Sequence, residues 1–215
     1  MKELIVPYIP SIRHHSPFAV IASELDKLPK HKIEIAPWEA FSYKPDVSFS
    51  IAYNEEGIFL KYFVMEKAIR AVYTQANEPV YKDSCVEFFI SLPNDPSYYN
   101  LEFNCIGTCL MGYRSSRHNR TLLPEEVISK IRHEAIIEND REGGAIVFKW
   151  SLILAIPLDV FAFHHNLSLK GQRCKANFYK CGDELPEPHY LCWNNIVSDK
   201  PDFHLPQYFG TLVFE

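Results

Sequence analysis

The chain has 215 residues, of which 47% are hydrophobic and 14% aromatic, and its formal net charge is -5. This size and composition are typical of a globular protein with one sizeable core, so we expect a single domain over residues 1–215. Because the net charge is weakly negative, we expect no broad basic surface that would attract phosphate groups, which argues against a nucleic-acid partner. No stretch approaches the roughly 20 apolar residues that cross a bilayer, and the N-terminal apolar run is too short for a secretory signal. With Met1 as the native start, we therefore expect a cytoplasmic protein with no membrane partner.

The six cysteines and nine histidines raise the question of disulfides or metal sites. The chain is neither short nor visibly exported, so free and buried thiols are expected instead of disulfides. The sequence contains no Cys-x-x-Cys pair, and Cys105 and Cys109 lie four positions apart. We therefore predict no zinc site and no cofactor.

The first predicted elements are a helix and a hairpin. Segment 16–28 begins with Ser-Pro and continues with apolar residues at helical spacing, which predicts a short helix with Ser16 as its N-cap. Segments 47–53 and 58–65 show a period of two and are joined by Asn-Glu-Glu-Gly. This pattern predicts a β-hairpin.

The middle of the chain predicts a meander. Runs at 84–92, 98–105 and 107–114 are separated by proline, asparagine and glycine, which favour turns. The arginine-rich segment 114–120 is interpreted as a loop. A second short helix is predicted at 123–131, where a proline precedes two glutamates.

The remaining sequence is again dominated by strand patterns. Candidate strands lie at 134–138, 145–154, 173–182, 189–193 and 209–215. Strands at this density bury one face each most simply in two stacked sheets. We therefore predict an all-β fold, a two-sheet antiparallel β-sandwich of jelly-roll or immunoglobulin-like type, with one or two short peripheral helices.

Polar side chains gather on one face of the central strands. Successive strand residues point to opposite sides, so Glu87 lies on the face opposite to that of the apolar residues next to it in the sequence. If strands 84–92 and 98–105 pair with their apolar faces together, Glu87 shares a surface with Asn100, Glu102 and Asn104. The outer side of an antiparallel sheet is normally polar, which is one explanation. Asparagine and facing like charges are unfavourable in strands, however, so a binding site is the other.

Two segments of this sequence carry a specific combination of motifs: "PVYKDSCVEFFISL" followed by "YYNLEFNCIGT", and "ANFYKCGDELPEPHYLCWNNIVSDKPDFHLPQYFGTLVF". Together they resemble the carbohydrate-binding modules of family 9 and their stand-alone relatives. The resemblance implies a β-sandwich that holds a sugar between two aromatic side chains above polar groups. By motif, Tyr81 and Trp193 take the positions of the aromatic clamp, and Glu87 and Asn104 those of the hydroxyl-binding groups. Tyr81 stands where the family usually has tryptophan, and Glu102 where it often has a basic residue.

The resemblance implies that the chain binds carbohydrate without catalysis. The expected ligand is a mono- or oligosaccharide, including a chain end, with Tyr81, Glu87, Asn104 and Trp193 in the site and Asn100 and Glu102 beside them. Aromatic rings suit the C–H faces of a pyranose, and carboxylates or amides suit its hydroxyls. No catalytic residue is assigned.

Three alternatives remain open at this point. Glu87 and Glu102 could serve as the carboxylate pair of a glycoside hydrolase, although no Gly-x-Ser-x-Gly signature occurs. The domain could also assist carbohydrate catabolism as an accessory module, or be a protein-interaction sandwich that has lost its sugar. Relatives can carry structural calcium, and "PNDPS", "NDRE" and "CGDE" contain oxygen ligands without a defined loop spacing. The oligomeric state is not predicted.

Overall fold

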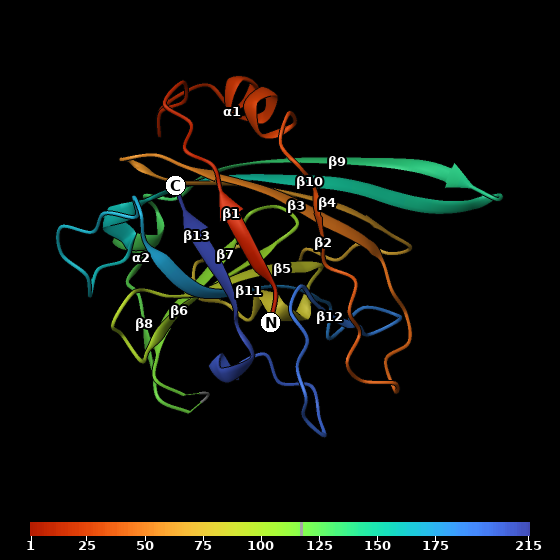
Figure 1. Cartoon of the computed structure of the whole chain (residues 1–215). Helices are drawn as coiled ribbons and strands as arrows, with labels where there is room; N and C mark the ends of the chain where they lie inside the picture. The colour runs from red at the N-terminus through yellow and green to blue at the C-terminus, as the bar shows by residue number, and fades with distance from the viewer. Residues whose placement is uncertain (117) are drawn as a thin grey trace.

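The computed structural model describes residues 1–116 and 118–215 and contains two β-sheets stacked face to face (Figure 1). Two short helices lie outside the sheets. The predicted all-β sandwich is therefore confirmed. Pairing between the described strands is antiparallel except between the first and last strands of the chain, which are parallel.

The larger sheet has eight strands. Seven of them follow the order β1 (Glu3–Val6), β13 (Gly210–Phe214), β11 (Arg173–Cys181), β5 (Cys85–Ser91), β6 (Tyr98–Asn104), β7 (Cys109–Arg114) and β8 (Arg120–Leu122). The eighth, β12 (Tyr190–Cys192), pairs with the end of β11, whereas β13 pairs with its beginning. The chain between β12 and β13 is thereby free to leave the plane of the sheet.

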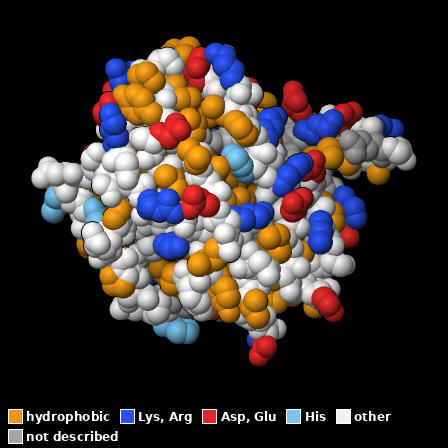
Figure 2. Space-filling model, in the orientation of Figure 1, with side chains coloured by type: hydrophobic (Ala, Val, Ile, Leu, Met, Phe, Trp, Pro, Cys, Tyr) orange, Lys and Arg blue, Asp and Glu red, His pale blue; other side chains and the backbone are white. Residues whose placement is uncertain are grey.

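The smaller sheet has five strands. Their order is β2 (His31–Lys32), β3 (Asp46–Tyr53), β4 (Gly57–Glu66), β10 (Ala145–Pro157) and β9 (Arg132–Glu142). The long β9–β10 hairpin extends beyond the rest of the molecule (Figure 1). Its turn is made by Gly143 and Gly144, which both have positive φ. Basic and acidic side chains are intermixed along this arm and over the visible face (Figure 2).

The helices form where they were predicted, with one difference at the first N-terminus. Helix α1 (Phe18–Leu25) buries Ile21 and Leu25 on the outer face of the smaller sheet, and α2 is the single turn Glu125–Ile128. Pro17 is the N-cap of α1, and the Ser16 hydroxyl accepts a hydrogen bond from the Arg13 backbone instead of capping the helix. None of the helices in the described ranges is long and apolar enough to span a membrane. Three 3₁₀ turns complete the set, at Val80–Lys82, Leu158–Val160 and Pro206–Tyr208.

Every predicted strand is present, within a few residues at its ends. The predicted loop 114–120 connects β7 to β8, and its residue 117 lies outside the described residues. Three short strands were missed, namely β1, β2 and β8. Strands of two to four residues carry too little alternation to be recognised without their partners.

Two apolar layers cover the two faces of the larger sheet. The main core lies between the sheets and includes Phe88 and Phe178, whose rings stack at 5.0 Å. A second cluster lies on the opposite face of the larger sheet, where loop residues such as Trp38 and Phe203 cover strand residues such as Phe89. The sequence left two interpretations of this face open, an ordinary polar surface or a binding site. Long loops cover the face, and the candidate site lies between these loops and the strands.

Candidate functional site

Two glutamates form the floor of a pocket on the outer face of the larger sheet. Glu87 on β5 and Glu102 on β6 are directly opposite in the strand register, and each is only 3% exposed. The predicted pairing of the apolar faces is thus confirmed. Asn100 donates a hydrogen bond of 2.8 Å to the Glu102 carboxylate, and its own side-chain oxygen accepts one of 2.7 Å from Arg114 Nε. The floor is therefore a connected layer of polar side chains.

Burial and nearby acidic groups disfavour the charged forms of these carboxyl groups. Burial, reinforced by the neighbouring Glu102, raises the pKa of Glu87 well above its usual value. Burial also raises the pKa of Glu102, while the Arg114 guanidinium opposes that rise. Asp183 beside them has its pKa raised to about 6, again mainly by burial. The pocket therefore concentrates acidic groups that would gain from hydrogen-bond donors or a cation.

Tyr81 reaches the same pocket from the 3₁₀ turn before β5. The turn is held by Asp83, which is fully buried and accepts hydrogen bonds from the backbone N–H groups of Val72 and Tyr73. Arg70 forms a salt bridge with the same carboxylate. On the other side, the backbone N–H of Asp183 donates to the Tyr81 carbonyl at 3.2 Å. These bonds fix the position of Tyr81 at the rim of the site.

Further aromatic surface comes from β12 and from the segment that follows it. Phe203 stacks on Tyr179 of β11 with ring centroids 4.1 Å apart, and the Tyr179 hydroxyl donates to the Phe203 carbonyl. Tyr190 approaches the edge of Phe203 at 6.1 Å. The His204 ring lies over Phe89 at 5.1 Å. The loop is thereby anchored on the outer face by ring contacts.

Together these groups enclose a cavity of about 230 Å³. Its lining combines aromatic rings with charged groups: Tyr81, Glu87, Glu102, Arg114, Arg120, Cys181, Asp183, Tyr190, Pro201, Asp202, Phe203 and His204. Of the six predicted site residues, the structure brings three into this lining, namely Tyr81, Glu87 and Glu102. Tyr81, Tyr190 and Phe203 thus give this cavity an aromatic edge.

Asn100 and Asn104 support the site from behind and do not line the cavity. Both are fully buried. Asn104 donates to the Tyr73 carbonyl at 2.8 Å and to Asp83 at 3.0 Å, and accepts from the Thr108 N–H at 2.9 Å. Its bonding capacity is therefore used to hold the loop that carries Tyr81, whereas the resemblance suggested direct contact with a ligand.

Trp193 is not brought to this pocket. Its side chain is 4% exposed and packs in the core between the sheets, 5.7 Å from Phe178 and 6.4 Å from Phe49. Gly210 makes room for it, because a Cβ there would lie 2.4 Å from the indole. The strand pattern explains the placement: Cys192 and Tyr190 face outward, so Trp193 faces inward with Leu191. The aromatic residue that β12 presents to the pocket is Tyr190, and the predicted sugar clamp of Tyr81 and Trp193 stays a prediction.

Several lining residues were missed from the sequence. Arg114 and Arg120 were interpreted only as loop charges, yet they lie opposite each other in the β7–β8 pairing. Extending the register from β6 to β7 would have placed Arg114 opposite Tyr98 and so on the site face. Phe203 and His204 lie in the C-terminal segment of the resemblance, but nothing local shows that this segment folds over β5.

The model of carbohydrate-binding family 9 matches residues 19–214. The chain belongs to carbohydrate-binding family 9. A similar solved structure is that of a proposed carbohydrate-binding protein from Bacteroides uniformis, with 36% sequence identity, a TM-score of 0.89, and coverage of 100% of this chain and 99% of that chain. No curated protein matches the sequence.

Two solved structures of family 9 modules from Caldicellulosiruptor kristjanssonii, each with a bound sugar, share the fold at much lower identity. One, in complex with glucose, has 10% identity and a TM-score of 0.59, with 100% of this chain and 96% of that chain covered. The other, in complex with cellotriose, has 8% identity and a TM-score of 0.58, with 100% and 94% covered. These family 9 structures support the fold of the present chain and not its individual ligand contacts.

Proposed function

We propose that this chain binds a carbohydrate without cleaving it, and that one sugar ring occupies the pocket above Glu87 and Glu102. The observation that carries the proposal is the lining itself, in which the rings of Tyr81, Tyr190 and Phe203 stand beside buried carboxyl groups. Aromatic rings bind the C–H faces of a sugar, and carboxyl and guanidinium groups bind its hydroxyls. Membership of carbohydrate-binding family 9 supports the same ligand class.

The size of the cavity favours a monosaccharide or the end of a chain. Its volume of about 230 Å³ is below the roughly 300–1,000 Å³ typical of pockets that bury a drug-sized ligand. One ring fits such a space better than several. The selectivity would come from the floor, because a ligand without matching hydroxyls would leave buried polar groups unpaired.

The arrangement of the carboxyl groups argues for binding over hydrolysis. In glycoside hydrolases the two carboxyl groups flank the scissile bond, which lies between them. Glu87 and Glu102 are neighbours in one sheet and project from the same floor. A ring bound above them would contact both from one side.

A glycan array followed by calorimetric titration tests this proposal. We expect Tyr81→Ala and Glu102→Gln to fold normally and to weaken binding of the best ligand at least about tenfold, since each removes a direct contact. Tyr8→Ala is the matched control, because Tyr8 is a partly exposed tyrosine bonded to Glu55, away from the pocket lining. Unchanged affinity in both pocket variants would refute the site, and release of a smaller sugar during incubation would refute the non-catalytic assignment.

A further inference from the structure

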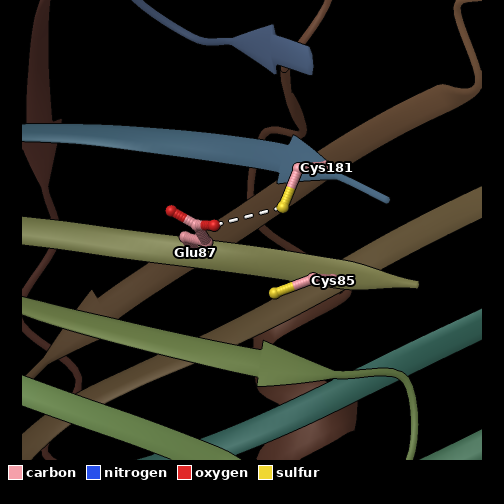
Figure 3. Close-up of side chains that lie close together, drawn as sticks. All are labelled: Cys85, Glu87 and Cys181. Carbon is pink, nitrogen blue, oxygen red and sulfur yellow. Dashed lines mark hydrogen bonds between the residues drawn. The ribbon is translucent and has the colours of Figure 1, made fainter. Parts of the chain in front are cut away.

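Two cysteines and one glutamate converge at the floor of the pocket. The side-chain ligand atoms of Cys85, Glu87 and Cys181 all lie within 4.8 Å of one another (Figure 3). The sheet produces this cluster directly: Cys85 and Glu87 are two residues apart on β5, so they share a face, and Cys181 on β11 is the register partner of Cys85. Three potential ligands from two strands are therefore held on rigid elements.

The spacing and chemistry of the cluster match one class of metal ion. Cys181 Sγ lies 3.2 Å from Glu87 Oε1. Zinc binds thiolates at about 2.3 Å and carboxylates at about 2.0–2.2 Å in tetrahedral sites, which separates ligand atoms by roughly 3.5–4 Å. Small side-chain adjustments suffice to reach that geometry. Sulfur ligands disfavour calcium and magnesium, which prefer oxygen.

The burial of Glu87 is a second, independent observation that points to a cation at this cluster. Its side chain is 3% exposed, and in the described part of the chain the donor to its carboxylate is the Cys181 thiol. A thiol is a weak donor, and an acidic group, Glu102, lies directly opposite. A buried carboxylate with so little compensation is costly unless it is paired or coordinates a metal.

The pocket supplies an entry path and a free coordination position. Glu87 and Cys181 line the cavity, whereas Cys85 is fully buried behind them. A cation entering from the pocket would thus meet three protein ligands on its inner side. Its remaining position would face the cavity, where water or a ligand oxygen could occupy it, as at zinc sites with three protein ligands.

We propose that Cys85, Cys181 and Glu87 bind a thiophilic divalent cation, with zinc as the metal whose preferences they match, at the floor of the pocket. Binding converts both thiols to thiolates and releases their two protons to solvent, together with the proton of any Glu87 carboxyl that was neutral before binding. With an ionised Glu87, the complex then carries one net negative charge. Arg114, which lines the same cavity, offers a neighbouring positive charge.

Cobalt substitution provides the test. Reduced, chelator-treated protein is titrated with Co²⁺, and thiolate-to-cobalt charge-transfer absorbance and the visible bands of tetrahedral cobalt are recorded. We expect one equivalent to bind, and Zn²⁺ to displace it. Cys85→Ser and Cys181→Ser should reduce the affinity by at least the roughly 10- to 100-fold that loss of an outer-shell partner costs. Glu87→Gln should keep the charge-transfer absorbance with weaker affinity.

Cys174→Ser is the matched control. Cys174 is also buried and lies on β11, but it pairs with Leu212 in the core between the sheets. This variant should bind cobalt as the wild type does. Circular dichroism and thermal unfolding report whether each variant is folded, and Glu87→Gln remains informative if a serine variant is not.

The proposal is overturned if wild-type protein shows no thiolate-to-cobalt absorbance and no zinc binding by calorimetry. It is equally overturned if folded Cys85→Ser and Cys181→Ser retain the wild-type signal. Sugar binding is measured separately on the metal-free protein. A failed metal site with intact sugar binding, or the reverse, therefore distinguishes this inference from the proposed function.

Discussion

Glu87 on β5 lies directly opposite Glu102 on β6, and both carboxyl groups are almost completely buried beneath the loops that cover the outer face of the larger sheet. Like-charged neighbours at directly opposed positions are unfavourable in an antiparallel pair. Retaining them at the floor of an aromatic-lined cavity is a local conflict of the kind found where a protein binds a ligand.

Because the two carboxyl groups are buried side by side, we expect one substitution to raise stability and to weaken sugar binding. Glu102→Gln removes a buried charge but keeps an oxygen that accepts from Asn100. Since the pKa of Glu102 is raised, the folded state disfavours its charged form, and the variant should be more stable at neutral pH by about 1 kcal/mol. Urea unfolding measures this change, while calorimetry measures the loss of sugar affinity. A variant that is less stable than the wild type would contradict the electrostatic account of the floor.

Asp83 should be essential for the loop that carries Tyr81. It is fully buried, accepts hydrogen bonds from two backbone N–H groups and from the Asn104 side chain, and forms a salt bridge with Arg70. Asp83→Ala leaves these donors without their acceptor, so we expect a loss of about 3–5 kcal/mol in the free energy of unfolding. Asp140→Ala is the control, because Asp140 makes an exposed ion pair with Lys149 and its loss should leave the denaturation midpoint unchanged. Equal denaturation midpoints for the two variants would show that Asp83 does not anchor this loop.

Tryptophan 193 should behave as a core residue. Trp193→Ala removes a large buried side chain that contacts Phe178, which typically costs about 3–5 kcal/mol. Trp193→Phe keeps much of the apolar contact and should fold and bind sugar with nearly wild-type affinity. Folded Trp193→Phe protein with no sugar binding, alongside Tyr81→Ala protein with full binding, would restore the clamp implied by the family resemblance.

His189 should make the fold sensitive to acid. Its Nε2 lies 2.8 Å from the Lys180 ammonium and its ring is fully buried, so burial and this charge lower its pKa to about 3. The unfolded chain takes up the proton near pH 6.5, whereas the folded chain does not, so stability falls as the pH drops from about 6.5 towards 3. The contribution is at most about 1.4 kcal/mol per pH unit.

His189→Gln isolates this contribution. As the pH falls, we expect the unfolding free energy of the wild type to decrease more than that of the variant. Denaturant unfolding at a series of pH values gives the comparison. Parallel pH profiles for the two proteins would show that His189 is protonated as easily in the folded state as in the unfolded state.

Strand alternation and turn residues were sufficient to predict most strands of the sandwich. They were also sufficient to place Glu87, Asn100, Glu102 and Asn104 on a common face. These are local properties, because a side chain's direction along a strand follows from its position in the pleat. The same rule applied to β12 would have turned Trp193 away from Tyr190.

The sequence by itself thus determined most of the strands, the two faces of the central strands and the acidic side chains that they share. Only the tertiary structure decided that Tyr190, Phe203 and Arg114 complete the pocket, and that Cys181 comes beside Cys85. It also decided that Asn104 holds the loop that carries Tyr81. The physical reason is that strand pattern depends on neighbours within a few residues. Loop placement depends on contacts between segments far apart in the chain, such as Phe203 on Tyr179, which no local pattern records.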